Sequence, residues 1–257
     1  MELVSLQWPE VANLDKERVV VVVPLGSLEQ HGLHMPFSTD TVIVTELARR
    51  VEQRLPDRVL LLPTQWLGHS PHHLAFPGTV SLDCRPYIDL LKGVCHSLVT
   101  GGFRRIFLLN GHGGNQIPAP VALRELKTEL KHISGLHIAF ASYWWLGQEA
   151  ISTVRESPLG GISHACEMET SIVLALHPER VRMDQVRRDG ELAGSRYLMP
   201  RDLQRTAKVL TVQEFEEMSE TGTIGHPDLA SAEKGERFLS GITEALVAFV
   251  EDFATWK

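Results

Sequence analysis

Five consecutive valines, residues 19–23, constrain the fold of this chain more than any other feature. An unbroken run of β-branched residues is typical of a strand that is buried on both faces of a parallel sheet. Pro24 and Gly26 then turn the chain, and the residues up to Asp40 are rich in carboxylate and imidazole side chains. The stretch therefore predicts a buried strand that leads directly into a candidate binding site.

Strand-like and helix-like patterns alternate after this run. Short apolar runs predict strands at residues 59–62, 106–109 and 136–141, and apolar positions at helical spacing predict helices at about 44–55, 86–100, 118–132 and 230–253. Such alternation indicates βαβ units, and hence an α/β fold with a mostly parallel sheet and helices on both faces. Residues 180–225 are more polar and are expected to form a partly helical excursion. No repeat or linker divides the sequence, so residues 1–257 are expected to form a single domain.

Composition and charge argue against several classes of partner. A net charge of −7 without a basic stripe does not favour nucleic acid. No apolar run approaches the ~20 residues of a membrane-spanning helix, and the acidic start of the sequence shows no signal peptide. The three cysteines lack CxxC spacing, which fits a reducing compartment. We therefore expect a cytoplasmic protein with no nucleic-acid or membrane partner.

Glu29 and His31 lie two residues apart just after the first predicted strand. In an extended segment their side chains face the same side, so both could bind one ion or two adjacent ions. Asp40 is expected near the start of the next helix, where its carboxylate could bridge two metals. The alternative is structural, with His31 as a turn residue and either Asp40 or Thr39 as a helix N-cap.

His112 lies in the sequence NGHGGN, residues 110–115, directly after the third predicted strand. Ligands of open parallel sheets bind at the carboxyl ends of the strands, so this turn and the turn around His31 should meet at one edge. The glycines would let the backbone approach a ligand closely. A tight turn without a ligand and a phosphate cradle are the alternatives, although the sequence is neither GxGxxG nor a P-loop.

Glu169 belongs to a third motif, SHACEMETSIVLALHP, which predicts a helix that begins at this residue and ends near His177. Helical spacing places Glu169 on the same stripe as Ile172 and Val173, where an unpaired carboxylate would be costly. A metal ion or an arginine partner is therefore expected there. Glu167 should point elsewhere, since two helical residues differ by about 200°.

The three motifs together supply a mixed set of carboxylates and imidazoles. The set is Glu29, His31, Asp40, His112 and Glu169. Such ligands suit Zn²⁺ or Mn²⁺, and three carboxylates with two histidines are enough for two ions that share a bridge. Two such ions clamp a hydroxide and polarise a carbonyl, which indicates hydrolysis with metal-bound water as the nucleophile. The HExxH sequence of many metalloproteases is absent.

Other residues are candidates for lining a substrate pocket. The segment at residues 66–81 contains His69, His72 and His73, and we expect His73 to contact the substrate. Asn115 at the end of NGHGGN is a second candidate. Trp145 is a third, because the aromatic residues 143–145 follow the last predicted strand and could wall a flat substrate. They could equally form a subunit interface.

Five sequence strings resemble the creatininase family, which is named after creatinine amidohydrolase. The strings are PLGSLEQHGLHMPFSTD, AFPGTVSL, NGHGGN, HACEMETS and GTIGHPDLASAEKGE, and they occur in family order over most of residues 19–235. The resemblance implies a three-layer α/β/α sandwich, often assembled as a homohexamer, with a dinuclear zinc or manganese centre. It also implies a hydrolase that cleaves a non-peptide C–N amide bond of a small molecule, of the cyclic amide or formamide type, with a metal-bridging hydroxide as nucleophile.

The resemblance also assigns roles to individual residues. It implies that Glu29, Asp40 and His112 bind one ion. It implies that His31, Asp40 and Glu169 bind the other, so that Asp40 is the bridge. His164 would transfer protons at the scissile amide, and Glu167 would take an acid/base or ligand role beside Cys166.

Departures from the family pattern leave alternatives open. Creatininases carry a functional glutamate where this chain has Gly114, and the last motif has His226 where an aspartate is expected. Creatinine is therefore not the expected substrate. A non-catalytic metal-binding or ligand-binding homologue and a peptidase-type cofactor-maturation enzyme of the same family are alternatives. A serine hydrolase with Ser163 as nucleophile is a further one, although no strand is predicted before Ser163 as that motif requires.

Overall fold

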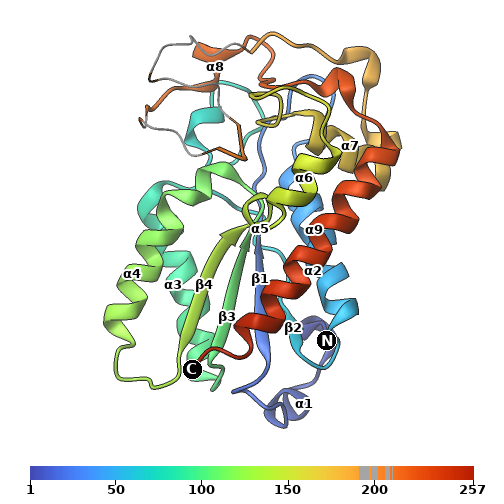
Figure 1. The fold of residues 1–257 in the computed structure, drawn as a ribbon. Coiled ribbons are helices and arrows are strands. Elements are labelled where there is room, and N and C mark those ends of the chain that lie inside the picture. The colour runs from blue at the N-terminus through green and yellow to red at the C-terminus, as the bar shows by residue number, and fades with distance from the viewer. Residues whose placement is uncertain (191–196, 198–201, 206–208, 210) are drawn as a thin grey trace.

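A parallel four-stranded sheet lies at the centre of the computed structural model, which describes residues 1–190, 197, 202–205, 209 and 211–257 (Figure 1). The strands are β1 (Val20–Leu25), β2 (Val59–Leu61), β3 (Arg105–Asn110) and β4 (His137–Ser142). Their order is β2-β1-β3-β4, and β1 and β3 pair in register from Val20 opposite Arg105 to Leu25 opposite Asn110. All carboxyl ends therefore lie at one edge of the sheet.

Helices cover both faces of this sheet, and the predicted three-layer α/β/α fold is confirmed (Figure 1). One face packs against α3 (Cys84–Thr100) and α4 (Pro118–Glu129). The other packs against α2 (Thr39–Arg54), α7 (Glu167–Leu176) and α9 (Ala232–Phe253), with α5 (Tyr143–Leu146) and α6 (Gln148–Val154) beside α9. The short helices α1 (Trp8–Ala12) and α8 (Phe215–Met218) lie at opposite ends of the molecule.

The valine run explains why both faces are covered. Val20 and Val22 belong to the hydrophobic core under α2, α7 and α9, whereas Val21 and Val23 belong to the core under α3 and α4. Every residue of β1 is buried. Burial of apolar surface contributes roughly 25 cal/mol per Å², so a charge at any position of this run would disrupt the layer that its side chain faces.

Several element boundaries differ from the sequence expectation by a few residues. The first strand continues through Pro24 to Leu25, because its neighbour β2 ends at Leu61, opposite Val22, and no ladder bond to β2 is lost at the proline. The third motif forms a helix from Glu167 rather than from Glu169, with Cys166 as the N-cap. This earlier start places both glutamates in the first turn of α7.

The described parts of the polar segment at residues 180–225 lie over the carboxyl edge of the sheet and include α8 (Figure 1). Parts of the predicted excursion, at residues 191–196, 198–201, 206–208 and 210, lie outside the described residues. Across the described ranges, none of the helices combines the length and the apolar character needed to cross a membrane.

Candidate metal centre

Five buried side chains meet at the carboxyl edge of the sheet. Glu29 and His31 follow β1, Asp40 lies in the first turn of α2, His112 follows β3, and Glu169 lies in the first turn of α7. They form two groups, Glu29 with Asp40 and His112, and His31 with Asp40 and Glu169, and in each group three potential ligand atoms lie within 4.8 Å of one another. The two groups share Asp40. The structure thus brings together the five residues that the sequence singled out.

The first group is arranged around His112. Its Nδ1 lies 3.2 Å from Oε1 of Glu29 and 3.0 Å from Oδ2 of Asp40. Its Nε2 lies 3.1 Å from the carbonyl oxygen of His69, to which it donates its hydrogen. With the hydrogen on Nε2, Nδ1 presents a lone pair to two carboxylate oxygens.

In the second group, a histidine lone pair likewise faces a carboxylate oxygen, here on the other side of Asp40. Nδ1 of His31 donates to the carbonyl oxygen of Glu29 at 3.1 Å, so the lone pair of Nε2 faces Oδ1 of Asp40 at 3.2 Å. Glu169 completes the group, and one of its oxygens accepts the N–H of Cys166 at 3.3 Å. No lysine or arginine among the described residues forms an ion pair with Glu169, so the expected alternative of an arginine partner is not supported.

This arrangement fits divalent cations. Acceptor atoms face acceptor atoms, and Oδ2 of Asp40 is buried without a hydrogen-bond donor. Three carboxylates gathered away from water require positive charge. Imidazole and carboxylate are the ligands that Zn²⁺ and Mn²⁺ accept. The second nitrogen of each ligand histidine is already hydrogen-bonded to a carbonyl oxygen, as in most histidines that bind metal.

Without a cation, protons must supply the charge. Burial by itself lowers the pKa of His31, but Asp40 and then Glu169 raise it to about 9. Burial likewise lowers the pKa of His112, but Glu29 and Asp40 hold it well above its usual value. Burial raises the pKa of Glu169 to about 7, although His31 opposes the shift. The raised pKa values of both histidines thus have one cause, the negative charge of the three carboxylates that surround them.

Two further histidines lie against Glu29. Nε2 of His73 is 3.2 Å and Nδ1 of His164 is 3.8 Å from Oε1 of Glu29. Phe215 of α8 covers both rings, with centroid distances of 3.9 Å to His73 and 4.6 Å to His164. Burial lowers the pKa of His164 to about 3 and the pKa of His73 well below its usual value, so both rings are neutral near pH 7.

Three other candidate residues are not brought into this cluster. Glu167 accepts the N–H groups of Glu156 and Ser157 and pairs with Lys234 at 2.9 Å, so its oxygens are engaged in a structural ion pair. The acid/base or ligand role expected of Glu167 is therefore not supported by its contacts and stays a prediction. Cys166 beside it is a buried thiol, and burial raises its pKa well above its usual value.

Asn115 and Trp145 also lie outside the cluster, and their substrate-binding roles stay predictions. The amide of Asn115 donates to the carbonyl oxygen of Gly26 and to the side chain of Asn110, and its oxygen accepts the N–H of His69. It therefore holds the turns that carry the ligands. Trp145 is 47% exposed and forms a T-shaped ring pair with Phe140, outside the cluster.

Gly114 is needed where it stands. A Cβ atom there would lie 2.0 Å from the carbonyl oxygen of His69 and 2.5 Å from Nε2 of His112. The segment that begins at His69 thus occupies the space that a side chain at position 114 would need. A glutamate cannot be accommodated at this position unless that segment moves.

Sequence reasoning missed several neighbours of the cluster. Ser27 donates to Oε2 of Glu29 at 3.0 Å and contacts Ser70 at 2.6 Å, and Gln30 contacts both outer histidines. Ser27 and Gln30 lie inside the PLGSLEQHG string, so their position beside Glu29 was available as a signal. Phe215 lies in no motif, and no sequence signal pointed to it.

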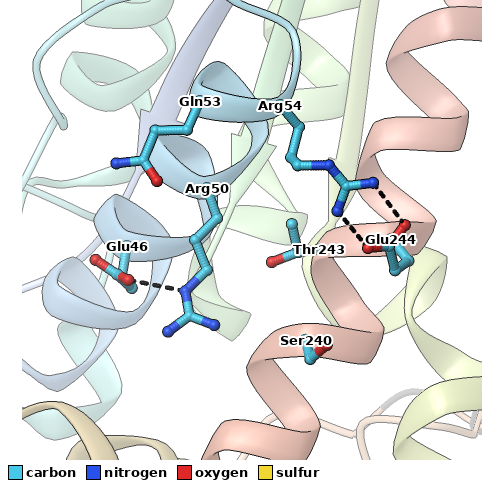
Figure 2. Close-up of a pocket in the computed structure, with 7 residues that line it drawn as sticks. All are labelled: Glu46, Arg50, Gln53, Arg54, Ser240, Thr243 and Glu244. Carbon is cyan, nitrogen blue, oxygen red and sulfur yellow. Dashed lines mark hydrogen bonds and ion pairs between the residues drawn. The ribbon is translucent and has the colours of Figure 1, made fainter.

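A surface groove with a volume of about 350 Å³ lies elsewhere, between α2 and α9 (Figure 2). Arg54 is fourteen residues beyond Asp40 on α2, which is ~20 Å at 1.5 Å per residue. Arg50 pairs with Glu46 at 2.8 Å, and Arg54 pairs with Glu244. Both arginines of the groove thus already have carboxylate partners, and the groove is not part of the candidate metal centre.

Fold and site together define a class, an α/β/α protein with a buried centre of histidines and carboxylates that can bind divalent cations. Within that class, the family model for creatininase, described as creatinine amidohydrolase, matches residues 4–250. Because the match spans nearly the whole chain, the protein belongs to the creatininase family of amidohydrolases.

Similar proteins carry different names. The chain is 30% identical over 261 residues to creatinine amidohydrolase of Pseudomonas putida, with 94% of each chain covered. It is 33% identical over 237 residues to the mycofactocin precursor peptide peptidase of Mycobacterium tuberculosis, with 88% of this chain and 82% of that protein covered. It is 29% identical to the 3-dehydro-scyllo-inosose hydrolase of Thermotoga maritima, with 96% and 82% covered. Family membership therefore leaves the substrate open.

Solved structures agree with the fold. A crystal structure of creatinine amidohydrolase superposes with a TM-score of 0.83 at 26% identity, over 100% of this chain and 98% of that chain. A zinc–zinc form of a creatininase mutant and a manganese creatininase give TM-scores of 0.82 and 0.79 at 27% identity, each over 98% of this chain and 97% of the other.

Proposed function

We propose that this chain is a metal-dependent amidohydrolase that cleaves a C–N amide bond of a small molecule, of the cyclic amide or formamide type. The observation that carries the proposal is the pair of groups around Asp40, in which lone pairs of His31 and His112 face carboxylate oxygens in a buried site. Only protons or cations can occupy such positions. Divalent cations are the more stable solution at neutral pH.

In this proposal two ions of Zn²⁺ or Mn²⁺ are bound. Glu29, Asp40 and His112 would hold one, and His31, Asp40 and Glu169 the other. When bound, such ions polarise a substrate carbonyl and lower the pKa of a water molecule to near neutrality. Zinc and manganese in the related creatininase structures support the choice of metals.

His164 is the residue we propose for proton transfer. Its Nε2 donates to the carbonyl oxygen of Gln30 at 2.8 Å, so Nδ1 carries a lone pair on the side of Glu29. A neutral imidazole held in this way can take a proton and deliver it to the leaving nitrogen of an amide. His73 lies beside it, and we keep substrate contact as its proposed role.

Burial favours a small substrate. Each of the five candidate ligands is at most 4% exposed, and Phe215 packs across His73 and His164 above them. Creatinine is not the substrate we propose, because the segment at His69 fills the space of the glutamate that creatininases carry at Gly114.

A peptidase is the second candidate. It is supported by the 33% identity to the mycobacterial mycofactocin precursor peptide peptidase over most of the chain. A peptide would have to displace Phe215 to reach the cluster, whereas a small amide needs a smaller opening. The two candidates therefore differ in the size of substrate that the enzyme accepts.

The test begins with metal analysis of protein purified without chelators, followed by reconstitution with Zn²⁺ or Mn²⁺. The loaded protein is assayed against cyclic amides, formamides and short peptides, with Glu169→Gln as the inactive control. Metal-dependent turnover of a small amide is the expected result. No bound metal, and no effect of added metal, would contradict the proposal, while metal binding without turnover of any substrate class would favour a non-catalytic homologue.

Location and assembly remain part of the proposal. Cys84, Cys95 and Cys166 are free thiols, which is compatible with the cytoplasmic location that we propose. A homohexamer is the assembly we propose, and light scattering coupled to gel filtration would measure it. The serine hydrolase alternative finds no support. Its nucleophile must directly follow a strand, but the strand that precedes Ser163 in the chain is β4, which ends at Ser142.

A further inference from the structure

Gln30 stands between the two candidate ligands Glu29 and His31 but points away from them. Its side chain is only 5% exposed although it carries no charge and coordinates nothing. The amide contacts three separate segments of the chain, at Gly32, Gly222 and His73. A buried amide that is fully engaged in this way is in a position to fix the hydrogens of its neighbours.

The orientation of the Gln30 amide follows from two backbone contacts. Oε1 accepts the N–H of Gly32 at 2.8 Å, and Nε2 donates to the carbonyl oxygen of Gly222 at 3.1 Å. In the reversed amide, the NH₂ group would face the N–H of Gly32 and the oxygen would face the carbonyl oxygen of Gly222, so neither hydrogen bond could form. Only glycine fits at position 222, where φ is +81° and a Cβ atom would lie 2.0 Å from Oε1 of Gln30. The amide is therefore fixed from both sides.

The second hydrogen of Nε2 decides the tautomer of His73. Nε2 of Gln30 lies 2.9 Å from Nδ1 of His73, and because the amide nitrogen can only donate, Nδ1 must accept. The ring hydrogen of His73 is then on Nε2, which lies 3.2 Å from Oε1 of Glu29. His73 is thereby a hydrogen-bond donor to a candidate metal ligand.

The backbone of the same residue decides the tautomer of His164. Its Nε2 lies 2.8 Å from the carbonyl oxygen of Gln30, which can only accept, so the ring hydrogen is on Nε2. The contact of 3.2 Å between this nitrogen and the amide nitrogen of Gln30 joins two donors and is not a hydrogen bond. Nδ1 of His164 is left with the lone pair that proton transfer requires.

We infer that Gln30 is a positioning residue that sets opposite roles for the two outer histidines. Its side chain makes His73 a donor that orients the Glu29 carboxylate, and its carbonyl makes His164 an acceptor. The inference rests on the proposed function in so far as Glu29 is a metal ligand. Residues that orient ligands in this way typically change metal affinity or activity about 10–100-fold when they are replaced.

The substitution Gln30→Glu tests the inference, because it keeps the shape but replaces the amide donor with a carboxylate that only accepts. His73 should then move its hydrogen to Nδ1 and present a lone pair to Glu29. His164 should keep its hydrogen on Nε2, because the backbone carbonyl is unchanged. Gln116→Glu is the matched control, since its amide donates to Ser142 away from both histidines.

Solid-state ¹⁵N NMR of histidine-labelled, zinc-loaded protein reads the tautomers, with His73→Gln and His164→Gln used to assign the signals. Competition with a chelator gives the zinc affinity. We expect hydrogens on Nε2 of both rings in the wild type. In Gln30→Glu we expect a tautomer change at His73 alone and about 10–100-fold weaker zinc binding, with both properties unchanged in Gln116→Glu.

A wild-type protein in which His73 carries its hydrogen on Nδ1 overturns the inference, as does an unchanged His73 in a folded Gln30→Glu variant. If Gln30→Glu does not fold, Gln30→Met removes the donor without adding charge, and His73 should then show both tautomers. The wild-type spectrum decides the assignment in either case. A wild type that binds no zinc overturns the proposed function instead, and the tautomers of the zinc-free protein still test the role of Gln30.

Discussion

Glu167 and Glu169 begin the same helix, two residues apart, and both are buried, yet their surroundings are opposite. Glu167 meets Lys234 and two backbone N–H groups, and although burial raises its pKa, these partners lower it below its usual value. Glu169 meets Asp40, Glu29 and a histidine, and burial raises its pKa to about 7. One carboxylate has its cation built into the protein. The other lies among carboxylates and a histidine without a lysine or arginine partner among the described residues, and this difference separates a structural ion pair from a candidate metal site.

The largest expected effect comes from Asp40→Asn, which removes the charge that the two groups share. We expect the metal content to fall from about two ions per chain to near zero. Activity should fall by about 10³-fold or more, because metal ions supply several kcal/mol of transition-state stabilisation and ~1.4 kcal/mol is tenfold in rate. Elemental analysis and the amide assay measure these quantities. A variant that still bound two ions would contradict the shared role of Asp40.

Glu169→Gln should affect only one side of the cluster. We expect the loss of about one of two ions, with the ion held by Glu29 and His112 retained. The metal-free protein should be as stable as the wild type or more stable, because a neutral amide replaces a carboxylate that lacks a cation. Metal stoichiometry and urea unfolding of the metal-free form are the measurements. Marked destabilisation of the metal-free form would show that Glu169 has a structural partner.

Glu167→Gln is the same substitution about half a helical turn away, and it should affect stability rather than metal content. The metal content should be unchanged, but the free energy of unfolding should fall by about 3 kcal/mol. We expect the lower end of the range for a broken buried pair, because Glu156 still lies 3.0 Å from Lys234. Urea unfolding of the metal-free protein measures the change. Loss of metal without loss of stability would reverse the assignment of the two glutamates.

Phe215→Ala tests whether the metal cluster, unlike the Glu167 pair, lies under a removable cover. The aromatic ring belongs to a small cluster with Met218 and Ile224 rather than to either main core. We therefore expect a loss of about 2 kcal/mol, below the 3–5 kcal/mol typical of a core phenylalanine. A chelator should remove metal faster than from the wild type. An unchanged removal rate in the folded variant would show that Phe215 does not limit access.

Arg85→Ala gives the smallest expected effect and serves as the reference for both glutamates. Arg85 pairs with Glu125 at 2.7 Å and with Asp89 at 2.6 Å on the surface of α3 and α4. Exposed pairs of this kind are screened by water and contribute little. We expect no measurable change in metal content or unfolding. A change as large as that of Glu167→Gln would mean that burial is not what separates the pairs.

The sequence by itself determined the strands, the layers and the set of five candidate ligands. The valine run and the helical stripes are local periodic patterns, and parallel strands place their carboxyl ends at one edge. Glu29, His31 and His112 follow strands in the sequence, so their meeting at one edge could be foreseen without a structure. Their assignment as metal ligands remains a prediction.

The tertiary structure decided which neighbours engage each group. Glu167 and Lys234 are sixty-seven residues apart, and no periodic pattern links them, so only packing of α7 against α9 shows that they form an ion pair. The contacts of Asn115 and Trp145 also came only from the structure, because sequence position does not show where an amide or a ring points. The hydrogens of His73 and His164 depend on the distances to Gln30, which only the folded chain fixes. Sequence patterns specify what is buried and on which face, whereas hydrogen-bond partners are set by contacts between segments that are distant along the chain.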